Sequence, residues 1–187
     1  KDGDQVLVIK IHGTIDLGLA PYTKRVLSQA EKEGAQASIL DINTPCGRLE
    51  AALQMKNAIL DSKIPVIAFV NREAFSAGSL IALAADEIYM APGAVMGAAT
   101  PVDQSGEKAS EKVVSAVRKD FKSLAELRGR DPQVAEAMVD ESLAIPGVVE
   151  AGKLLTLTTE EAVGLGYARE TDDFDTLLDD LNLSGAA

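Results

Sequence analysis

The chain has 187 residues, a length that suits one domain with a hydrophobic core of its own. Hydrophobic residues make up 47% and aromatic residues only 4%, a mixture typical of an α/β protein packed with branched aliphatic side chains. The formal net charge of −11 argues against nucleic acid as a partner, because phosphate binding needs a basic surface. The single cysteine excludes an intramolecular disulfide.

The first half of the chain alternates between apolar runs and segments of helical periodicity. We expect helices at residues 19–33, 49–62 and 76–85, and strands at residues 6–11, 37–42, 66–70, 87–90 and 94–96. Residues 71–75 are expected to connect the third strand to the third helix. This alternation predicts an α/β fold in which parallel strands are covered by helices.

The second half begins with residues 97–109, which are small and polar and predict a mobile loop. We expect the next helix to run from Ser110 to about residue 128, with an apolar face formed by Val113, Val114, Val117, Phe121 and Leu124. The remaining elements are expected to be a short helix at 131–138, a hairpin at 148–157 turning at Gly152, a helix opened by the capping box of Thr158 and Glu161, and an acidic helix at 173–181.

The ends of the chain suggest a piece of a longer protein. The sequence begins at Lys1 rather than at a methionine, and it ends in small residues at 184–187. We therefore expect residues 1–187 to be a single excised domain, so that any signal peptide or membrane anchor would lie outside it. The chain contains no run near the roughly 18–20 apolar residues of a membrane span.

Ser76 is the first candidate for chemistry. It stands where a buried strand and a short connection turn into a helix of small residues. A helix N-terminus offers free N–H groups and a positive dipole end, which favour a developing oxyanion. Gly78 follows as in the second half of a G-x-S-x-G nucleophile elbow, while Ala74 replaces the first glycine. The alternative is that Ser76 only caps a core helix.

Gly47 is the second candidate. It follows a predicted strand and a proline and precedes a helix, so its N–H can point into the same cleft as that of Ala77. Two such amides form an oxyanion hole without any side chain. The alternative is an ordinary Pro-x-Gly turn.

A nucleophilic serine also needs a base. The only histidine, His12, lies far upstream in the first strand-to-turn segment and fits a local hydrogen bond better. A lysine can take this role, and five follow Ser76: Lys108, Lys112, Lys119, Lys122 and Lys153. Lys112 falls in the first turn of a helix, where the dipole disfavours a cation. Helical phase puts it opposite Val117 and Phe121, so an ordinary solvated lysine stays open.

Several separated motifs together resemble a known family. They are residues 43–47, 76–84, 90–98, 122–126, 128–130 and 157–166, together with Lys112. In this order they resemble the Clp-protease class of serine proteases. They are more closely similar to the N-terminal protease domain of NfeD-like membrane-bound serine proteases, relatives of signal peptide peptidase A.

The resemblance implies a Clp/crotonase-like fold of stacked β-β-α units and a Ser–Lys dyad. Ser76 matches the family's nucleophile. Lys112 matches its general base, because it lies ten residues before Lys122 as the family pattern has it. Gly47 and Ala77 match the amides of the oxyanion hole. The family uses no catalytic histidine, metal or cofactor, and we expect none here.

The same resemblance implies a serine endopeptidase that cleaves hydrophobic peptide segments. Its expected partners are membrane-protein substrates, including the C-terminal region of stomatin-like proteins. We expect a homo-oligomer, at least a dimer, within a larger protein that is membrane-associated and holds this domain on the extracytoplasmic side.

Cys46 departs from the family pattern, which has a glycine at this position. A negative φ would tolerate the cysteine, whereas a positive φ would cost on the order of 1 kcal/mol. Two rival functions also remain. A crotonase-like acyl-CoA enzyme shares the fold, but it needs acidic catalytic residues and basic residues for the phosphates, and no such cluster stands out. In a non-catalytic scaffold module, Ser76 would only cap its helix.

Overall fold

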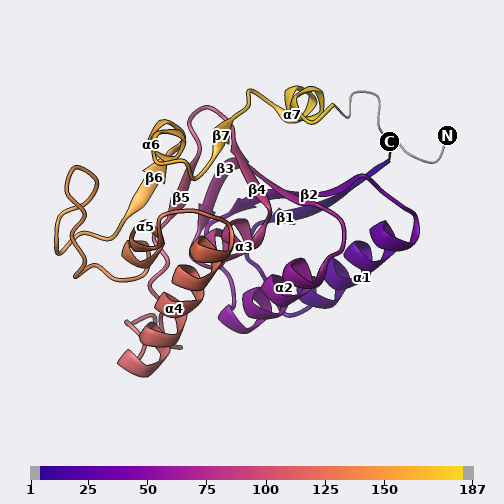
Figure 1. Cartoon of the computed structure of the whole chain (residues 1–187). Helices are drawn as coiled ribbons and strands as arrows, with labels where there is room; N and C mark the ends of the chain where they lie inside the picture. The colour runs from indigo at the N-terminus through magenta and orange to yellow at the C-terminus, as the bar shows by residue number, and fades with distance from the viewer. Residues whose placement is uncertain (1–4, 183–187) are drawn as a thin grey trace.

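The structure is a computed structural model that describes residues 5–182. Within these residues, seven strands form one sheet against which the helices pack (Figure 1). The strands are β1 (Val6–His12), β2 (Ala37–Thr44), β3 (Val66–Phe75), β4 (Glu87–Met90), β5 (Val95–Gly97), β6 (Thr156–Thr158) and β7 (Arg169–Glu170). The helices are α1 (Leu19–Lys32), α2 (Leu49–Asp61), α3 (Ala77–Ala84), α4 (Glu111–Leu127), α5 (Pro132–Ala137), α6 (Thr159–Gly164) and α7 (Phe174–Asp180).

The main path of the sheet is β1-β2-β3-β4-β7, and all of its pairs are parallel. β3 is long enough to have two neighbours on one side, because its first half pairs with β4 and its second half with β5. β6 then adds to β5 as an antiparallel strand. The parallel α/β class and the expected strand order along the chain are confirmed.

Two expectations about connections are wrong. Residues 71–75 continue β3, because β5 supplies ladder partners for Glu73, Ala74 and Phe75. The hairpin expected at 148–157 does not form. β6 pairs with β5 instead, and the segment before it carries only an isolated bridge between Ile145 and Val149. β7 was not foreseen, since its two residues give no periodic signal.

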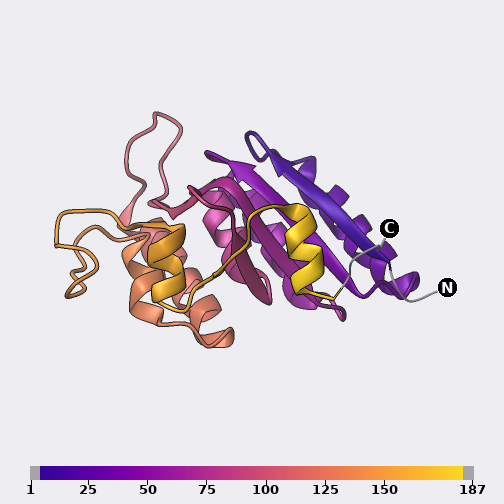
Figure 2. The ribbon, with the colours of Figure 1, turned by 90° about the horizontal axis from the view of Figure 1, so that it is seen from above.

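Alternation along the strands divides the core between the two faces of the sheet. Side chains such as those of Ile9, Ile42 and Val70 face the larger core, which lies against α1 to α4. Those of Ile39, Ile67 and Phe69 face the other way and are covered by α7, which Figure 2 shows lying across the sheet. The acidic C-terminal helix is therefore part of the packed domain.

The predicted helices form with bounds close to those expected. α4 buries Val114, Val117, Phe121 and Leu124 as its periodicity predicts. Val113 is an exception, since it is 36% exposed in the first turn of α4. The capping box of α6 is confirmed in both directions, because each of Thr158 and Glu161 accepts a backbone N–H bond from the other.

Candidate active site

Ser76 occupies a strained turn between β3 and α3. Its φ of 55° and ψ of −121° are unusual for a residue with a side chain, and such a conformation costs of order 1–3 kcal/mol. Its N–H donates to the Gly97 carbonyl at 3.1 Å, which ties the turn to β5. Its hydroxyl makes no capping bond to the N–H groups of α3, all of whose residues are described. Ser76 therefore precedes the helix without capping it through its side chain.

The residues after Ser76 bring α3 close to β2. A Cβ at Gly78 would overlap the methyl group of Thr44, so the close approach requires a glycine. Ser79 is fully buried, and its hydroxyl donates to the Ser76 carbonyl at 2.7 Å. The two serines thus differ in hydrogen bonding within one turn: the Ser79 hydroxyl is bonded inside the helix, while the Ser76 hydroxyl makes no capping bond at its N-terminus.

Gly47 lies opposite Ile15 in a parallel bridge whose hydrogen bonds are made by its neighbours Cys46 and Arg48. The Ile15 N–H donates to the Cys46 carbonyl at 3.1 Å, and the Arg48 N–H donates to the Ile15 carbonyl at 3.0 Å. In extended chain, successive residues direct their polar groups to opposite sides, so the N–H of Gly47 points away from Ile15. It makes no hydrogen bond within residues 5–182. A side chain at Gly47 would overlap that of Ile15, which explains the glycine.

Ser76, Ala77 and Gly47 line one cavity of about 470 Å³. This volume lies in the range typical of ligand sites. The cavity is lined mainly by apolar side chains and also by three charged residues; the full set adds Arg48, Leu49, Glu50, Leu80, Ala99, Pro101, Val102, Asp103, Gln104, Val117 and Phe121. The N–H of Ala77 is among the first N–H groups of α3, which have no partner within a helix. The structure thus brings the predicted serine and both predicted amides to one apolar site.

Lys112 does not line this cavity. It is the second residue of α4, it is exposed, and it makes no ion pair with any of residues 5–182. His12 is also elsewhere, paired with Asp41 at 3.1 Å where β1 ends. The local role expected for His12 is therefore supported, whereas Lys112 and Ser76 are not brought together in this structure.

Sequence reasoning missed one wall of the cavity, the segment from Pro101 to Gln104. Residues 101–109 form a narrow loop that projects from the body of the domain (Figure 2), with a bridge between Val102 and Lys108. Asp103 organises its tip by accepting hydrogen bonds from the N–H and hydroxyl of Ser105, and these bonds lower the pKa of the Asp103 carboxyl. The Asp-x-Ser-Gly pattern was the available signal, since it is typical of a tight turn.

With the geometry established, comparison with known proteins assigns the family. Residues 5–187 match the family model described as NfeD1b, N-terminal domain. This chain belongs to that family. Membrane protein NfeD1b of Bacillus subtilis is 42% identical over 183 residues, covering 97% of this chain and 42% of its own length. Membrane-bound protease PH1510 of Pyrococcus horikoshii is 34% identical over 169 residues, covering 86% of this chain and 36% of its own. The chain thus spans about two fifths of the curated relatives it matches.

Solved structures of relatives share the fold. The membrane-bound stomatin-specific protease 1510-N of Pyrococcus horikoshii, solved as a serine-to-alanine variant, has a TM-score of 0.81 and 33% identity, covering 94% of this chain and 83% of its own. A lysine-to-alanine variant, solved with a substrate peptide, matches with the same TM-score and covers 78% of its own chain. ClpP1 of Listeria monocytogenes, at 19% identity and a TM-score of 0.70, covers 93% of this chain and 95% of its own. The Clp-like fold expected from the sequence is confirmed.

Two further observations bear on the family comparison. Cys46 is outside the positive-φ region, so a cysteine carries no backbone strain where the family pattern has glycine. Its exposed thiol lies 3.8 Å from the hydroxyl of Thr14.

Although the curated relatives are membrane proteins, none of the helices described between residues 5 and 182 is long and apolar enough to span a bilayer.

Proposed function

We propose that this domain is a serine endopeptidase with Ser76 as its nucleophile. The observation that carries the proposal is the strained turn at Ser76, which leaves its hydroxyl without a capping bond at a cavity that Gly47 also lines; the Gly47 N–H has no hydrogen-bond partner within residues 5–182. A structural cap would have bonded the N–H groups of α3. A strained residue between a strand and a helix is the arrangement that exposes a nucleophile in an elbow.

Gly47 and Ala77 are proposed to bind the oxyanion. As the Ser76 oxygen forms a bond to the peptide carbonyl carbon, negative charge develops on the carbonyl oxygen. The free N–H of Gly47 and the first N–H groups of α3 would then stabilise that charge by hydrogen bonding. Loss of one such donor typically costs about a hundred- to a thousandfold in turnover.

Lys112 is proposed as the base. Its neutral amine would take the hydroxyl proton of Ser76 as the ester bond forms, and return it to the leaving amine as the peptide C–N bond breaks. Water would then release the acyl group through the same proton transfers. This assignment is supported by the related protease, whose solved forms include a serine-to-alanine variant and a lysine-to-alanine variant with substrate peptide.

Peptide binding would have to bring the Lys112 amine to the cavity. The two residues replaced in the relative are a few positions farther apart than Ser76 and Lys112, so the segment between them is shorter here. That segment includes the projecting loop, residues 101–109, which both lines the cavity and leads into α4. We propose that the loop orders on the substrate and recruits the flexible lysine side chain.

The proposed substrates are hydrophobic peptide segments. Leu80, Val117 and Phe121 provide an apolar surface beside Ser76 that suits such a segment. The related protease is specific for a stomatin homologue, so the C-terminal region of a stomatin-like membrane protein is the first candidate. We further propose that the domain works as a homo-oligomer on the extracytoplasmic side of a membrane-associated protein, without metal or cofactor.

A fluorophosphonate probe tests this function, because it forms a covalent bond only with an activated serine. Mass spectrometry of the labelled domain is expected to find the adduct on Ser76. An acyl-CoA enzyme of the same fold or a scaffold module would stay unlabelled. An unlabelled domain that also fails to cleave hydrophobic peptides would refute the proposal.

A further inference from the structure

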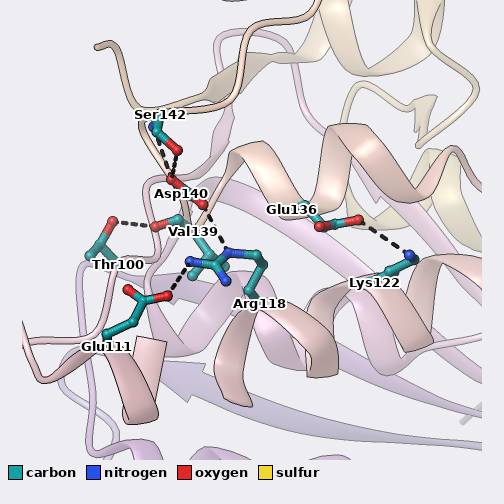
Figure 3. Close-up of polar contacts among 8 residues, drawn as sticks. All are labelled: Thr100, Glu111, Arg118, Lys122, Glu136, Val139, Asp140 and Ser142. Carbon is teal, nitrogen blue, oxygen red and sulfur yellow. Dashed lines mark hydrogen bonds and ion pairs between the residues drawn. The ribbon is translucent and has the colours of Figure 1, made fainter. Parts of the chain in front are cut away.

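Arg118 joins the start of α4 to the segment that follows α5 (Figure 3). Its Nε atom lies 2.9 Å from Oδ2 of Asp140, and its Nη2 atom lies 3.2 Å from Oε1 of Glu111. The side chains of Arg118 and Asp140 are only 17% and 13% exposed, whereas that of Glu111 is 73% exposed. Arg118 therefore forms an ion pair with Asp140 at its buried end, although its Nε atom makes no well-aligned hydrogen bond within the described residues, and it pairs with an otherwise solvent-facing carboxylate at the first residue of α4.

Asp140 is itself held in place. Its Oδ1 atom accepts hydrogen bonds from the N–H of Ser142 at 2.9 Å and from the Ser142 hydroxyl at 2.6 Å. These bonds, together with the charges of Arg118 and Lys108, lower the pKa of the Asp140 carboxyl, so it is ionised at neutral pH. The partner of Arg118 is thus a charged group with a fixed orientation.

The segment that contains Asp140 is also attached to the wall of the cavity. The Thr100 hydroxyl donates to the Val139 carbonyl at 2.6 Å, and the Ala99 N–H donates to the Met138 carbonyl at 2.7 Å. Ala99 lines the cavity that contains Ser76. Through Asp140, Arg118 therefore links α4 to the backbone segment that forms part of the cavity wall.

Most residues of the first turn of α4 are exposed. Residues 110–113 are all exposed, and the Ser110 hydroxyl makes no capping bond to the N–H groups of this helix, which is described throughout. The first buried side chain is that of Val114. The ion pair between Glu111 and Arg118 is a second side-chain contact, besides the buried Val114, that ties this turn and Lys112 within it to the domain.

We propose that Arg118 is a positioning residue: by bridging Glu111 and Asp140 it holds the turn that carries Lys112 in a fixed orientation relative to the Ser76 cavity. The inference rests on the proposed role of Lys112 as the base and identifies the contact that holds its turn in place. With the turn fixed, the lysine side chain and the projecting loop move when a peptide binds, while the turn keeps its orientation. Without Arg118, the whole turn samples more orientations, and fewer of them permit proton transfer.

Lys122 provides a matched control on the same helix. It also forms an ion pair across to α5, with 3.8 Å between its Nζ atom and Oε1 of Glu136, but it lies far from the first turn (Figure 3). We expect Arg118→Met to lower kcat for peptide cleavage by about ten- to a hundredfold, the usual cost of a misplaced catalytic group. KM should change little, and Lys122→Met should stay near the wild-type kcat.

A second pair of variants, both at Glu111, distinguishes a positioning effect of the Glu111–Arg118 contact from an effect of the Glu111 charge alone. Glu111→Gln keeps an oxygen that can accept from Arg118 and should retain most of the turnover, whereas Glu111→Ala should lose about as much as Arg118→Met. Because Glu111 is exposed, both variants should fold even if Arg118→Met does not. Equal loss in both Glu111 variants would overturn positioning in favour of a charge effect.

Amide hydrogen exchange tests the anchor independently of any activity. The Val114 N–H bonds the Ser110 carbonyl at 3.0 Å and reports the first turn of α4. In Arg118→Met this amide should exchange about tenfold faster or more, with no change in Lys122→Met. Unchanged exchange of this amide in Arg118→Met would contradict the proposal that Arg118 anchors the turn. Faster exchange together with a kcat equal to that of Lys122→Met would show that the anchor does not position Lys112. Full turnover in Lys112→Ala would instead refute the proposed base, while exchange still decides the anchor.

Discussion

The two sides of the candidate site are built differently. Ser76, Ala77 and Gly47 belong to the junctions of β3 with α3 and of β2 with α2, where two glycines permit contacts that any side chain would block. Lys112 belongs to an exposed turn that follows a projecting polar loop. The proposed nucleophile and oxyanion amides are therefore preassembled by the core, whereas the proposed base depends on surface elements. Chemistry at this site should respond to changes on the two sides in different ways.

The largest expected effect on the surface side is the loss of Lys112. Lys112→Ala should lower turnover by about a hundred- to ten-thousandfold, the typical contribution of a general base, while the free energy of unfolding stays near that of the wild type because the residue is exposed. Lys112→Arg should be equally inactive, since a guanidinium stays protonated. An active arginine variant in a peptide-cleavage assay would mean that another group is the base.

The core side should instead respond through stability. Gly78→Ala places a methyl group against that of Thr44, and such overpacking should lower the free energy of unfolding by about 1–3 kcal/mol. Turnover should fall as well, since α3 has to shift and carries the N–H of Ala77 with it. Gly164→Ala is a matched control because nothing lies within 4 Å of its added Cβ. Urea unfolding measures the difference, and equal stability of the two variants would contradict the close approach.

Hydrogen exchange should separate the two sides directly. The amides of residues 104–106, at the tip of the projecting loop, are expected to exchange far faster than those of α3, because the tip is exposed and α3 is fully buried. A bound substrate analogue should slow exchange in the loop. Slow exchange throughout residues 97–109 in the free domain would contradict the proposed ordering on binding.

The smallest expected effect is on the pH dependence of stability that arises from Asp140. The Ser142 hydroxyl is the main cause of the lowered pKa of Asp140, so Ser142→Ala should cost about 1 kcal/mol at neutral pH. A carboxyl group whose pKa is lowered by folding stabilises the folded state at pH values above the pKa that the group has in the unfolded chain. That contribution is lost as the pH falls through the lower pKa that the group has in the folded protein. The stability gap between wild type and Ser142→Ala, measured by urea unfolding, should therefore narrow below about pH 4. A gap that widens in acid would contradict the pKa direction.

Much of the fold could be predicted from local signals. Helix periodicity gave the buried stripe of α4, and the capping pattern at Thr158 gave the start of α6. What failed depended on pairing between distant segments: β3 extends through residues 71–75 only because β5 adds to it, and β6 pairs with β5 rather than within a hairpin. No local window contains that information.

The candidate site divides in the same way. Ser76, Gly47 and Ala77 were predicted from strand-to-helix junctions, and the parallel sheet brings such junctions to one edge. The wall formed by Pro101 to Gln104 was missed because a loop without periodicity gives no sign of what it lies against. The tertiary network at Arg118 was equally invisible, since Asp140 is distant in sequence.

The comparison of Ser76 with Ser79 tests the central claim most directly, because the two serines lie one turn apart with their hydroxyls in different settings. Ser76→Ala should abolish cleavage of a hydrophobic peptide while changing the free energy of unfolding by less than the roughly 1–2 kcal/mol of a lost helix cap, because the Ser76 hydroxyl makes no capping bond. Ser79→Ala should retain substantial turnover, since alanine suits a helix interior. Cleavage is measured with both variants at equal concentration, after each is shown to be folded. Full activity in Ser76→Ala, or loss of activity only in Ser79→Ala, would contradict the assignment of the nucleophile.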